Sequence, residues 1–232
     1  MRLDKLLANK AFGSRKVVHQ IIKDGRVTVN GVVILKKDQS IHIDDDIIAV
    51  DGVQISTKQQ YYIKFHKPAG YITAVEDPTH PVVMDLLPPE FKKMGVFPVG
   101  RLDKDTEGLL LLTNDGIWAH SIINGHKHVP KVYYVEFNGK LTKEGIERIE
   151  TGIVLGDGTQ CKPANIDVLS EQSLHITIEE GKYHQVKRMI GAAGGEVTYL
   201  KRLSIGHITL NGIEAINTYS EIDDQDVVDF KK

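Results

Sequence analysis

A charged segment between two apolar runs constrains the fold of this chain most. The segment Gly100–Gly108 follows the apolar run Val96–Val99 and precedes the apolar run Leu109–Leu112. Between Arg101 and Thr106 every residue but one is polar. Charged side chains beside core-forming segments are costly unless they are paired or lie at the floor of a cleft. The pattern indicates either a charged turn that joins a strand to a core segment, or a functional site.

The size and composition are those of an ordinary globular protein. The chain has 232 residues, of which 41% are hydrophobic and 26% charged, and this length suits two small domains or one large one. Its apolar runs are shorter than the roughly 18 residues that span a bilayer, and its N-terminus has no secretory-signal pattern. The single cysteine, Cys161, has no partner for an internal disulfide and no evident base beside it, so we expect a structural role. These features favour a reducing compartment such as the cytoplasm.

The charge is distributed unevenly along the chain. Residues 1–37 contain nine lysines and arginines against two aspartates, although the whole chain has a net charge of −2. A basic N-terminal part on an acidic body indicates that one end of the protein binds a polyanion. We favour a nucleic acid over the alternative of a merely solvated surface.

The N-terminal part has the pattern of two short helices followed by a β-hairpin. Apolar spacing predicts a helix over residues 1–10, and Ser14 is a suitable N-cap for a second helix. Asn30-Gly31 between β-branched runs predicts a tight hairpin. We expect a further strand pair with an acidic turn over Ser40–Asp51, and a polar linker over Val53–Gln60.

We place the domain boundary in this linker, with one domain over residues 1–57 and a second over residues 58–232. The second is rich in predicted strands, with few helices and several Asn-Gly turns. We expect an α+β domain with a largely antiparallel mixed sheet, not a doubly wound one. The acidic segment Glu221–Asp229 is expected to be a solvated terminus.

Asp103 is the first candidate for chemistry. A carboxylate acts as a nucleophile or general base only when ionised, and a partly buried one stays ionised only beside a cation. Arg101 and Lys104 are nearby cations. Lys187 is a distant one, one position off the apolar stripe of a helix predicted over His184–Ala193, so it either reaches inward or is an ordinary surface lysine.

The basic N-terminal part, from residue 1 to about 55, resembles the alpha-L RNA-binding module first described in a small-subunit ribosomal protein. The resemblance rests on Arg2–Leu7, Ser14-Arg15 and Asp24–Gly31. It implies a small α/β module whose helices lie against RNA phosphates, binding in a salt-sensitive way without reading sequence. The RNA-contacting residues it implies are Arg2, Lys5, Ser14, Arg15 and Lys16.

The rest of the chain resembles the bacterial pseudouridine synthases. Four motifs occur in the order of that family: Lys67–Gly70, Gly100–Leu110, Lys131–Tyr133 and Glu180–Met189. The sequences of Asp77–Pro81 and Tyr183–Arg188 are similar to those of the ribosomal small-subunit pseudouridine synthase A branch. The resemblance implies that a specific uridine in small-subunit ribosomal RNA is isomerised to pseudouridine, on naked RNA or on an assembly intermediate.

The resemblance also implies roles for four residues. Asp103 would be the catalytic aspartate, attacking the ribose or assisting cleavage of the glycosidic bond of a flipped-out uridine. Arg101 would help to extrude the uridine or fill its gap, and Tyr133 would stack on the uracil. Lys187 would pair with Asp103, where many relatives use an arginine that offers a bidentate fork. An isomerisation needs no redox cofactor, and no Gly-Lys-Ser/Thr phosphate loop is present. We expect a monomer without a cofactor, a metal or a membrane partner.

Other functions are weighed against this one. The target can be large-subunit ribosomal RNA, or the chain can be a non-catalytic RNA-binding ribosome-assembly protein, although its intact Asp103 argues against the latter. A haloacid-dehalogenase-type phosphatase needs Asp-x-Asp-x-Thr/Val, whereas Thr106 directly follows Asp105. A metal site at His126-Lys127-His128 has no cysteine partner and no His-Glu-x-x-His motif, so a solvated loop is favoured.

Overall fold

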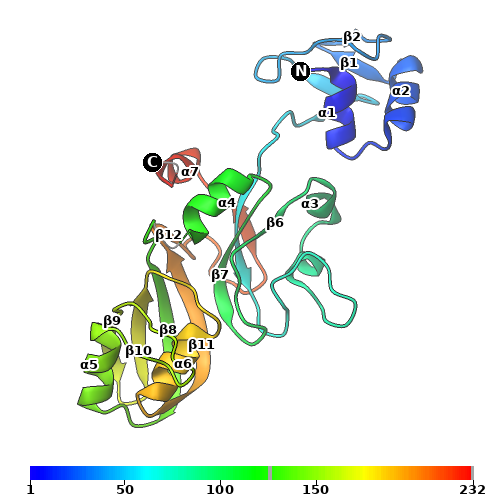
Figure 1. Ribbon diagram of the computed structural model, residues 1–232. Coiled ribbons are helices and arrows are strands. Elements are labelled where there is room, and N and C mark those ends of the chain that lie inside the picture. Colours follow the sequence, from blue (N-terminus) through cyan, green and yellow to red (C-terminus); the bar gives the residue numbers. More distant parts are fainter. Residues whose placement is uncertain (125–126, 231–232) are drawn as a thin grey trace. The chain divides into compact units, whose positions relative to one another are not determined.

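The computed structural model describes residues 1–124 and 127–230, which form two compact units (Figure 1). The first unit contains Met1–Tyr61 together with Pro88–Val96, and the second contains Tyr62–Leu87 together with the chain from Phe97 onward. Each unit has its own sheet. The sequence-based division after residue 57 stays a prediction.

The first unit packs its two N-terminal helices on a four-stranded sheet and also includes the short helix α3 (Pro89–Lys93). Its strand order is β2-β1-β3-β4. Helix α2 begins where predicted, because the Ser14 hydroxyl accepts a hydrogen bond from the Val17 amide. Its core consists of apolar side chains from both helices and the sheet, including Leu3, Leu6, Leu7, Ile22 and Ile48. The elements are α1 (Leu3–Asn9), α2 (Arg15–Lys23), β1 (Val27–Val29), β2 (Val32–Val33), β3 (Ile48–Val50), β4 (Val53–Ile55) and α3 (Pro89–Lys93).

Two expectations for the first unit are wrong. Ser40–Asp51 is not a strand pair, because β3 begins only at Ile48 and pairs with β1 and β4. The expected linker Val53–Gln60 starts with strand β4, because Asp51 and Gly52 both adopt positive φ and close a tight hairpin between β3 and β4.

The second unit is built on one nine-stranded mixed sheet. The main path runs β13-β5-β7-β11-β8-β10-β9, with β6 paired to β7 and β12 paired to β11. Strands β7 and β11 run parallel, and the other described pairings are antiparallel, so the predicted fold class is confirmed. The strands are β5 (Tyr62–Lys67), β6 (Phe97–Val99), β7 (Glu107–Thr113), β8 (Lys131–Gly139), β9 (Asn165–Ser170), β10 (Ser173–Ile178), β11 (Gly195–Ile205), β12 (Ile208–Thr209) and β13 (Tyr219–Glu221).

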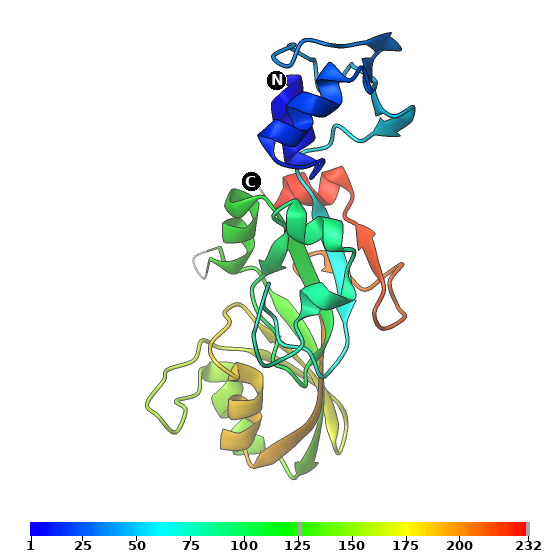
Figure 2. The ribbon, with the colours of Figure 1, turned by 90° about the vertical axis from the view of Figure 1, so that its right-hand side faces the viewer.

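Helices cover this sheet in two groups. Helices α5 (Lys143–Thr151) and α6 (Gln185–Ala192) lie on the same face of strands β8 to β11 (Figure 2). Helix α4 (Gly116–Ile123) and the terminal helix α7 (Asp224–Asp229) pack together, and a 3-10 helix, η1 (Val83–Leu86), follows the loop after β5. Within residues 1–124 and 127–230, no helix has the length and hydrophobicity that crossing a membrane requires.

The acidic C-terminal segment is not solvated as expected. The fully buried Trp118 of α4 donates its indole N–H to the Val227 carbonyl at 3.1 Å, and its ring lies edge-on 6.0 Å from Phe230. Val227 and Phe230 are three residues apart, so they share one face of α7 and its C-terminal turn. This apolar pair secures the acidic helix to the core.

Candidate active site

The charged segment that carries Asp103 is a loop between two paired strands. Strand β6 ends at Val99, and β7 begins at Glu107 and runs back antiparallel to it. Both strands contribute to the core, since Val99 and Leu109–Leu112 are buried. The loop therefore lies at one end of the β6–β7 pair and is held there by its neighbours.

Lys67, at the end of β5, holds the Asp103 loop in place through hydrogen bonds to its backbone. Its side chain is fully buried, and its Nζ donates to the carbonyl oxygens of Thr106 at 2.7 Å, Asp103 at 3.2 Å and Lys104 at 3.3 Å. Burial lowers the pKa of Lys67 to about 8, although the negative charges of Asp105 and Asp103 act in the opposite direction. An ammonium group supplies three donors and no acceptor, which suits a ring of backbone carbonyls.

Thr73 and Gly70 hold the same loop from a second side. The Thr73 hydroxyl donates to the Leu102 carbonyl at 2.8 Å and accepts from the Leu102 amide at 3.0 Å. The Gly70 amide donates to the Lys104 carbonyl at 2.7 Å. The backbone on both sides of Asp103 is thus fixed by hydrogen bonds before any substrate arrives, which is the preorganisation that catalysis requires.

The Asp103 carboxylate lies between two basic side chains from the segment of α6. Its Oδ2 is 3.3 Å from Lys187 Nζ, and its Oδ1 is 3.4 Å from His184 Nε2. The Asp103 side chain is 25% exposed, so its carboxylate is reachable from solvent. The cation that Asp103 was expected to need is therefore in place.

Lys187 is shared between two carboxylates. Its Nζ lies 2.6 Å from Asp105 Oδ1, closer than to Asp103. Burial raises the pKa of Asp105, but the hydrogen bond and charge of Lys187 outweigh this, so the pKa of Asp105 falls below its ordinary value. Asp105 is thus part of the ion-pair cluster and not only a solvated turn residue.

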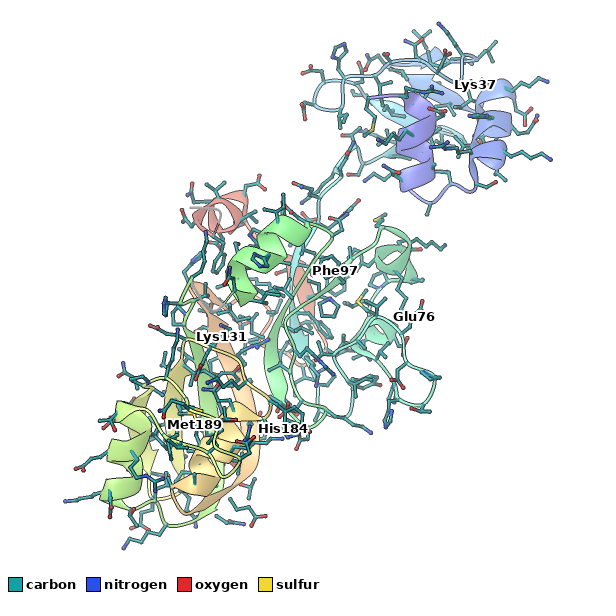
Figure 3. The ribbon with its side chains drawn as sticks, in the orientation of Figure 1. Lys37, Glu76, Phe97, Lys131, His184 and Met189 are labelled. Atoms are coloured by element: carbon teal, nitrogen blue, oxygen red, sulfur yellow. The ribbon has the colours of Figure 1, made fainter. Side chains whose placement is uncertain are left out.

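Helix α6 delivers these groups because of its amphipathic pattern. Val186, Met189 and Ile190 are buried against the sheet, and Lys187 lies beside this stripe, as predicted. His184 precedes the helix as its N-cap, with a φ of 45° and a ψ of 37°. In Figure 3, His184 lies on the side of this segment toward β7, and Met189 lies on the other side.

Tyr133 lies in one row of the sheet with the end of the Asp103 loop. It is opposite Arg202 in the β8–β11 pairing, and Arg202 is opposite Gly108 in the β11–β7 pairing. The buried Arg202 donates from Nε to the Leu109 carbonyl at 2.7 Å and from Nη1 to the Tyr133 hydroxyl at 3.5 Å. Tyr133 itself is only 7% exposed, so neighbouring groups cover its ring.

The other acid of the loop segment is also engaged. Glu107 is half-buried at the start of β7, and the Tyr199 hydroxyl donates to it at 2.7 Å. Burial, followed by this hydrogen bond, raises the pKa of Tyr199. Glu107 therefore links β7 to β11.

The remaining predicted site residues lie at exposed positions. Arg101 is exposed at the start of the Asp103 loop. In the first unit, Lys5, Arg15 and Lys16 are exposed. Arg2 is 54% exposed but donates two hydrogen bonds to Asp4, at 3.0 and 2.8 Å.

The Arg2–Asp4 pair and the Ser14 cap are structural contacts of the first unit. The hydrogen bond from Arg2, followed by that from His19, lowers the pKa of Asp4 to about 2 even though Asp4 is buried. The Ser14 hydroxyl caps α2. Lys5, Arg15 and Lys16 are therefore the freer candidates for phosphate contacts.

No metal site emerges from the described part of the chain. Within residues 1–124 and 127–230, no group of three or more His, Cys, Asp and Glu side chains is arranged to hold an ion. His126 lies outside the described residues. Cys161 is buried, and its burial raises the pKa of its thiol.

The structure thus combines a loop aspartate beside basic side chains, on a mixed sheet, with a separate small unit that exposes basic residues, as expected of an enzyme that acts on RNA. The comparisons with known proteins specify that class. Residues 61–192 match the family model described as RNA pseudouridylate synthase, and residues 1–47 match that of the S4 domain. The chain therefore belongs to the RNA pseudouridylate synthase family.

Relatives match this chain over almost its full length. The uncharacterized RNA pseudouridine synthase YtzG of Bacillus subtilis is 43% identical, covering 98% of this chain and 97% of its own length. Ribosomal small subunit pseudouridine synthase A of Escherichia coli is 35% identical, with 98% of each chain covered. A crystal structure of a pseudouridylate synthase superposes with a TM-score of 0.69 at 29% identity, covering 99% of each chain.

These matches confirm the family predicted from the motifs. The protein is an RNA pseudouridine synthase, an isomerase that converts uridine in RNA to pseudouridine. Its N-terminal unit carries the RNA-binding S4 domain. Sequence reasoning did not assign roles to Lys67, Thr73, His184 and Arg202, which the structure places around Asp103 and Tyr133.

Proposed function

We propose that this enzyme isomerises a specific uridine of small-subunit ribosomal RNA and that Asp103 is its catalytic group. The observation that carries the proposal is the Asp103 carboxylate, which lies between Lys187 and His184 on a loop fixed by Lys67. In the reaction the N1–C1′ bond of uridine breaks and a C5–C1′ bond forms. N1 gains a proton and C5 loses one, so atoms and electrons balance without an oxidant or cofactor.

The contact with Lys187 supports this role of Asp103. Lys187 Nζ lies 3.3 Å from Asp103 Oδ2, so the carboxylate has a cationic partner beside it. An ionised carboxylate can attack C1′ or stabilise the positive charge that develops there as the glycosidic bond breaks. Lys187 therefore holds the Asp103 carboxylate in place for the reaction.

Two further residues act on the flipped-out nucleotide. A base inside RNA structure must leave its stack before its glycosidic bond is accessible. The exposed Arg101 is suited to fill the gap that the uridine leaves. Tyr133 supplies a ring for the uracil once the groups over it have moved, and such stacking contributes about 1–3 kcal/mol.

The first unit supplies affinity without base reading. Exposed Lys5, Arg15 and Lys16 contact phosphates in this proposal, and phosphate contacts make binding depend on salt. Replacing all three with glutamine should lower the slope of log K against log salt by about 2 to 3. An unchanged slope in a filter-binding titration would contradict this role.

Small-subunit RNA is the favoured substrate because relatives such as the Escherichia coli enzyme are named ribosomal small subunit pseudouridine synthase A. Large-subunit RNA is the alternative target, and a non-catalytic role in ribosome assembly is the alternative function. With ribosomal RNA as the substrate, we place the enzyme in the cytoplasm, acting as a monomer on naked RNA or an assembly intermediate.

A matched pair of substitutions in the loop tests the proposal. Asp103→Asn and Asp105→Asn remove one carboxylate each from the same loop and the same lysine. Ribosomal RNA from a strain lacking this protein is incubated with each variant, and pseudouridine is mapped by chemical labelling on both subunits' RNA. We expect one new site in small-subunit RNA with the wild type and with Asp105→Asn, and none with Asp103→Asn.

Three results would contradict the proposal. A site formed at the wild-type rate by Asp103→Asn refutes the catalytic role of that residue. Labelling confined to large-subunit RNA refutes the substrate, and no labelling by the wild type on either RNA or on assembly intermediates refutes the enzymatic function.

A further inference from the structure

Tyr183 presents an aromatic ring to solvent next to the active site. Its side chain is 76% exposed, among the most exposed of the large apolar and aromatic residues described. One face of the ring is covered by the imidazole of His184, with the ring centroids 3.8 Å apart and the planes inclined by 18°. Folding stability does not account for such exposure, because an exposed aromatic side chain removes little apolar area from water.

His184 connects this ring to the reacting centre. The imidazole that stacks on Tyr183 places its Nε2 3.4 Å from Asp103 Oδ1. His184 reaches this position through a left-handed backbone conformation, which costs a non-glycine residue free energy. Strain of this kind at the edge of a site is an observation that points to function.

The turn that carries the pair is fixed by its own hydrogen bonds. The buried Gln185 donates from its amide to Glu180 at 2.7 Å and accepts from the Lys182 amide at 2.9 Å. Arg188 donates to the Tyr183 carbonyl at 3.2 Å. The ring of Tyr183 is therefore presented by a rigid turn and not by a disordered loop.

We propose that Tyr183 binds a nucleotide next to the target uridine by stacking on its base, and that His184 is a positioning residue for Asp103. The inference rests on the proposed role of Asp103. Flipping a uridine leaves the neighbouring base without a stacking partner, and an exposed aromatic ring beside the catalytic carboxylate can replace that partner. The chemistry that Tyr183 recognises is the π-face of a base, so the contact is tolerant of sequence.

Substitutions can separate the two roles kinetically. Tyr183→Ala should raise KM for a hairpin RNA carrying the mapped uridine about 5- to 150-fold with kcat nearly unchanged, and Tyr183→Phe should restore the wild-type KM. His184→Phe keeps a flat ring under Tyr183 but loses the nitrogen that faces Asp103. It should lower kcat about 10- to 100-fold with KM nearly unchanged.

A fluorescent base tests the contact itself. The hairpin RNA is made twice, with 2-aminopurine on either side of the uridine. Binding of the wild type should change the 2-aminopurine fluorescence in one of these two RNAs. Tyr183→Ala should abolish that change, whereas Tyr219→Ala, a 44% exposed tyrosine on the edge strand β13, should keep it. Circular dichroism establishes that each variant is folded.

The outcomes separate the inference from the proposed function. If the wild type isomerises the RNA but Tyr183→Ala keeps both its KM and the fluorescence change, stacking at Tyr183 is refuted and the function stands. If His184→Phe keeps the wild-type kcat, the positioning role is refuted. A wild type that binds with the fluorescence change but forms no pseudouridine supports the stacking contact and refutes the function.

Discussion

Gly108 is the residue at which a single methyl group should do the most damage to the active site. It is the second residue of β7, next to the Asp103 loop, has a φ of +106°, and lies opposite Arg202 in the parallel pairing with β11. A Cβ at this position would lie 2.2 Å from the Arg202 carbonyl oxygen and 2.6 Å from its amide nitrogen. Both partners are backbone atoms, so only a shift of one strand can relieve the clash.

The expected cost of Gly108→Ala has two parts. An L-residue in the left-handed region costs about 1–2 kcal/mol. Forcing apart two packed strands costs a further 1–3 kcal/mol, roughly. The free energy of unfolding should therefore fall by about 2–5 kcal/mol. A displaced β7 also moves the Asp103 loop, so kcat should fall in the fraction that remains folded.

Gly212→Ala is the matched control. Gly212 also has a positive φ, +78°, but a Cβ there would meet no atom within 4 Å. Its substitution should cost only the conformational part, about 1–2 kcal/mol. Urea denaturation of both variants measures the difference. Equal losses of stability would show that β7 and β11 separate freely, and would refute the view that this pairing sets the position of the loop.

Three further predictions concern the supports of the loop. Lys67 has a pKa of about 8 in the folded state, against its ordinary value of 10.5. Between these two pH values the unfolded state binds more protons than the folded state. The contribution of Lys67 to the free energy of unfolding therefore rises with pH. Between pH 8 and 10, urea denaturation should show that the free energy of unfolding rises more steeply with pH for the wild type than for Lys67→Arg, by up to about 1.4 kcal/mol per pH unit. Equal slopes would refute the lowered pKa of the buried Lys67. Thr73→Val leaves both polar groups of Leu102 unpaired and should cost about 1–3 kcal/mol, measured by urea denaturation. Lys187→Gln should lower kcat more than it raises KM, because Lys187 contacts the Asp103 carboxylate, and steady-state kinetics would show the reverse if Lys187 served to bind a phosphate.

Local signals made parts of the fold predictable. Ser14 and Asn30-Gly31 fixed the start of α2 and the first hairpin, because a cap and a tight turn depend on neighbouring residues only. Strand β3 was misplaced because its partner β1 lies about twenty residues earlier, and no local pattern marks that pairing. Helix α7 was missed because its acidic composition obscured the apolar pair of Val227 and Phe230.

The site was predictable where chemistry leaves a motif. Asp103 and Lys187 stand in two of the motifs that resemble those of pseudouridine synthases, and the structure brings their side chains to 3.3 Å. Lys67 begins one of the motifs, but its role was not predictable, because Lys67 and Thr73 both bind backbone groups of the distant Asp103 loop and the sequence does not mark backbone partners. Arg202 was missed because an arginine inside a strand is ordinarily exposed, whereas this one is 3% exposed.

The position of the site follows from how the sheet is joined. Strands β7 and β11 pair in parallel only at Glu107 and Gly108, so few backbone hydrogen bonds connect the two halves of the sheet there. The Asp103 loop belongs to one half, and α6, which packs on β11, belongs to the other. Lys187 crosses this junction with one ammonium group that contacts both Asp103 and Asp105. A lysine suits this place better than an arginine, because a compact point charge can serve two carboxylates at different angles, whereas a planar fork is matched to one.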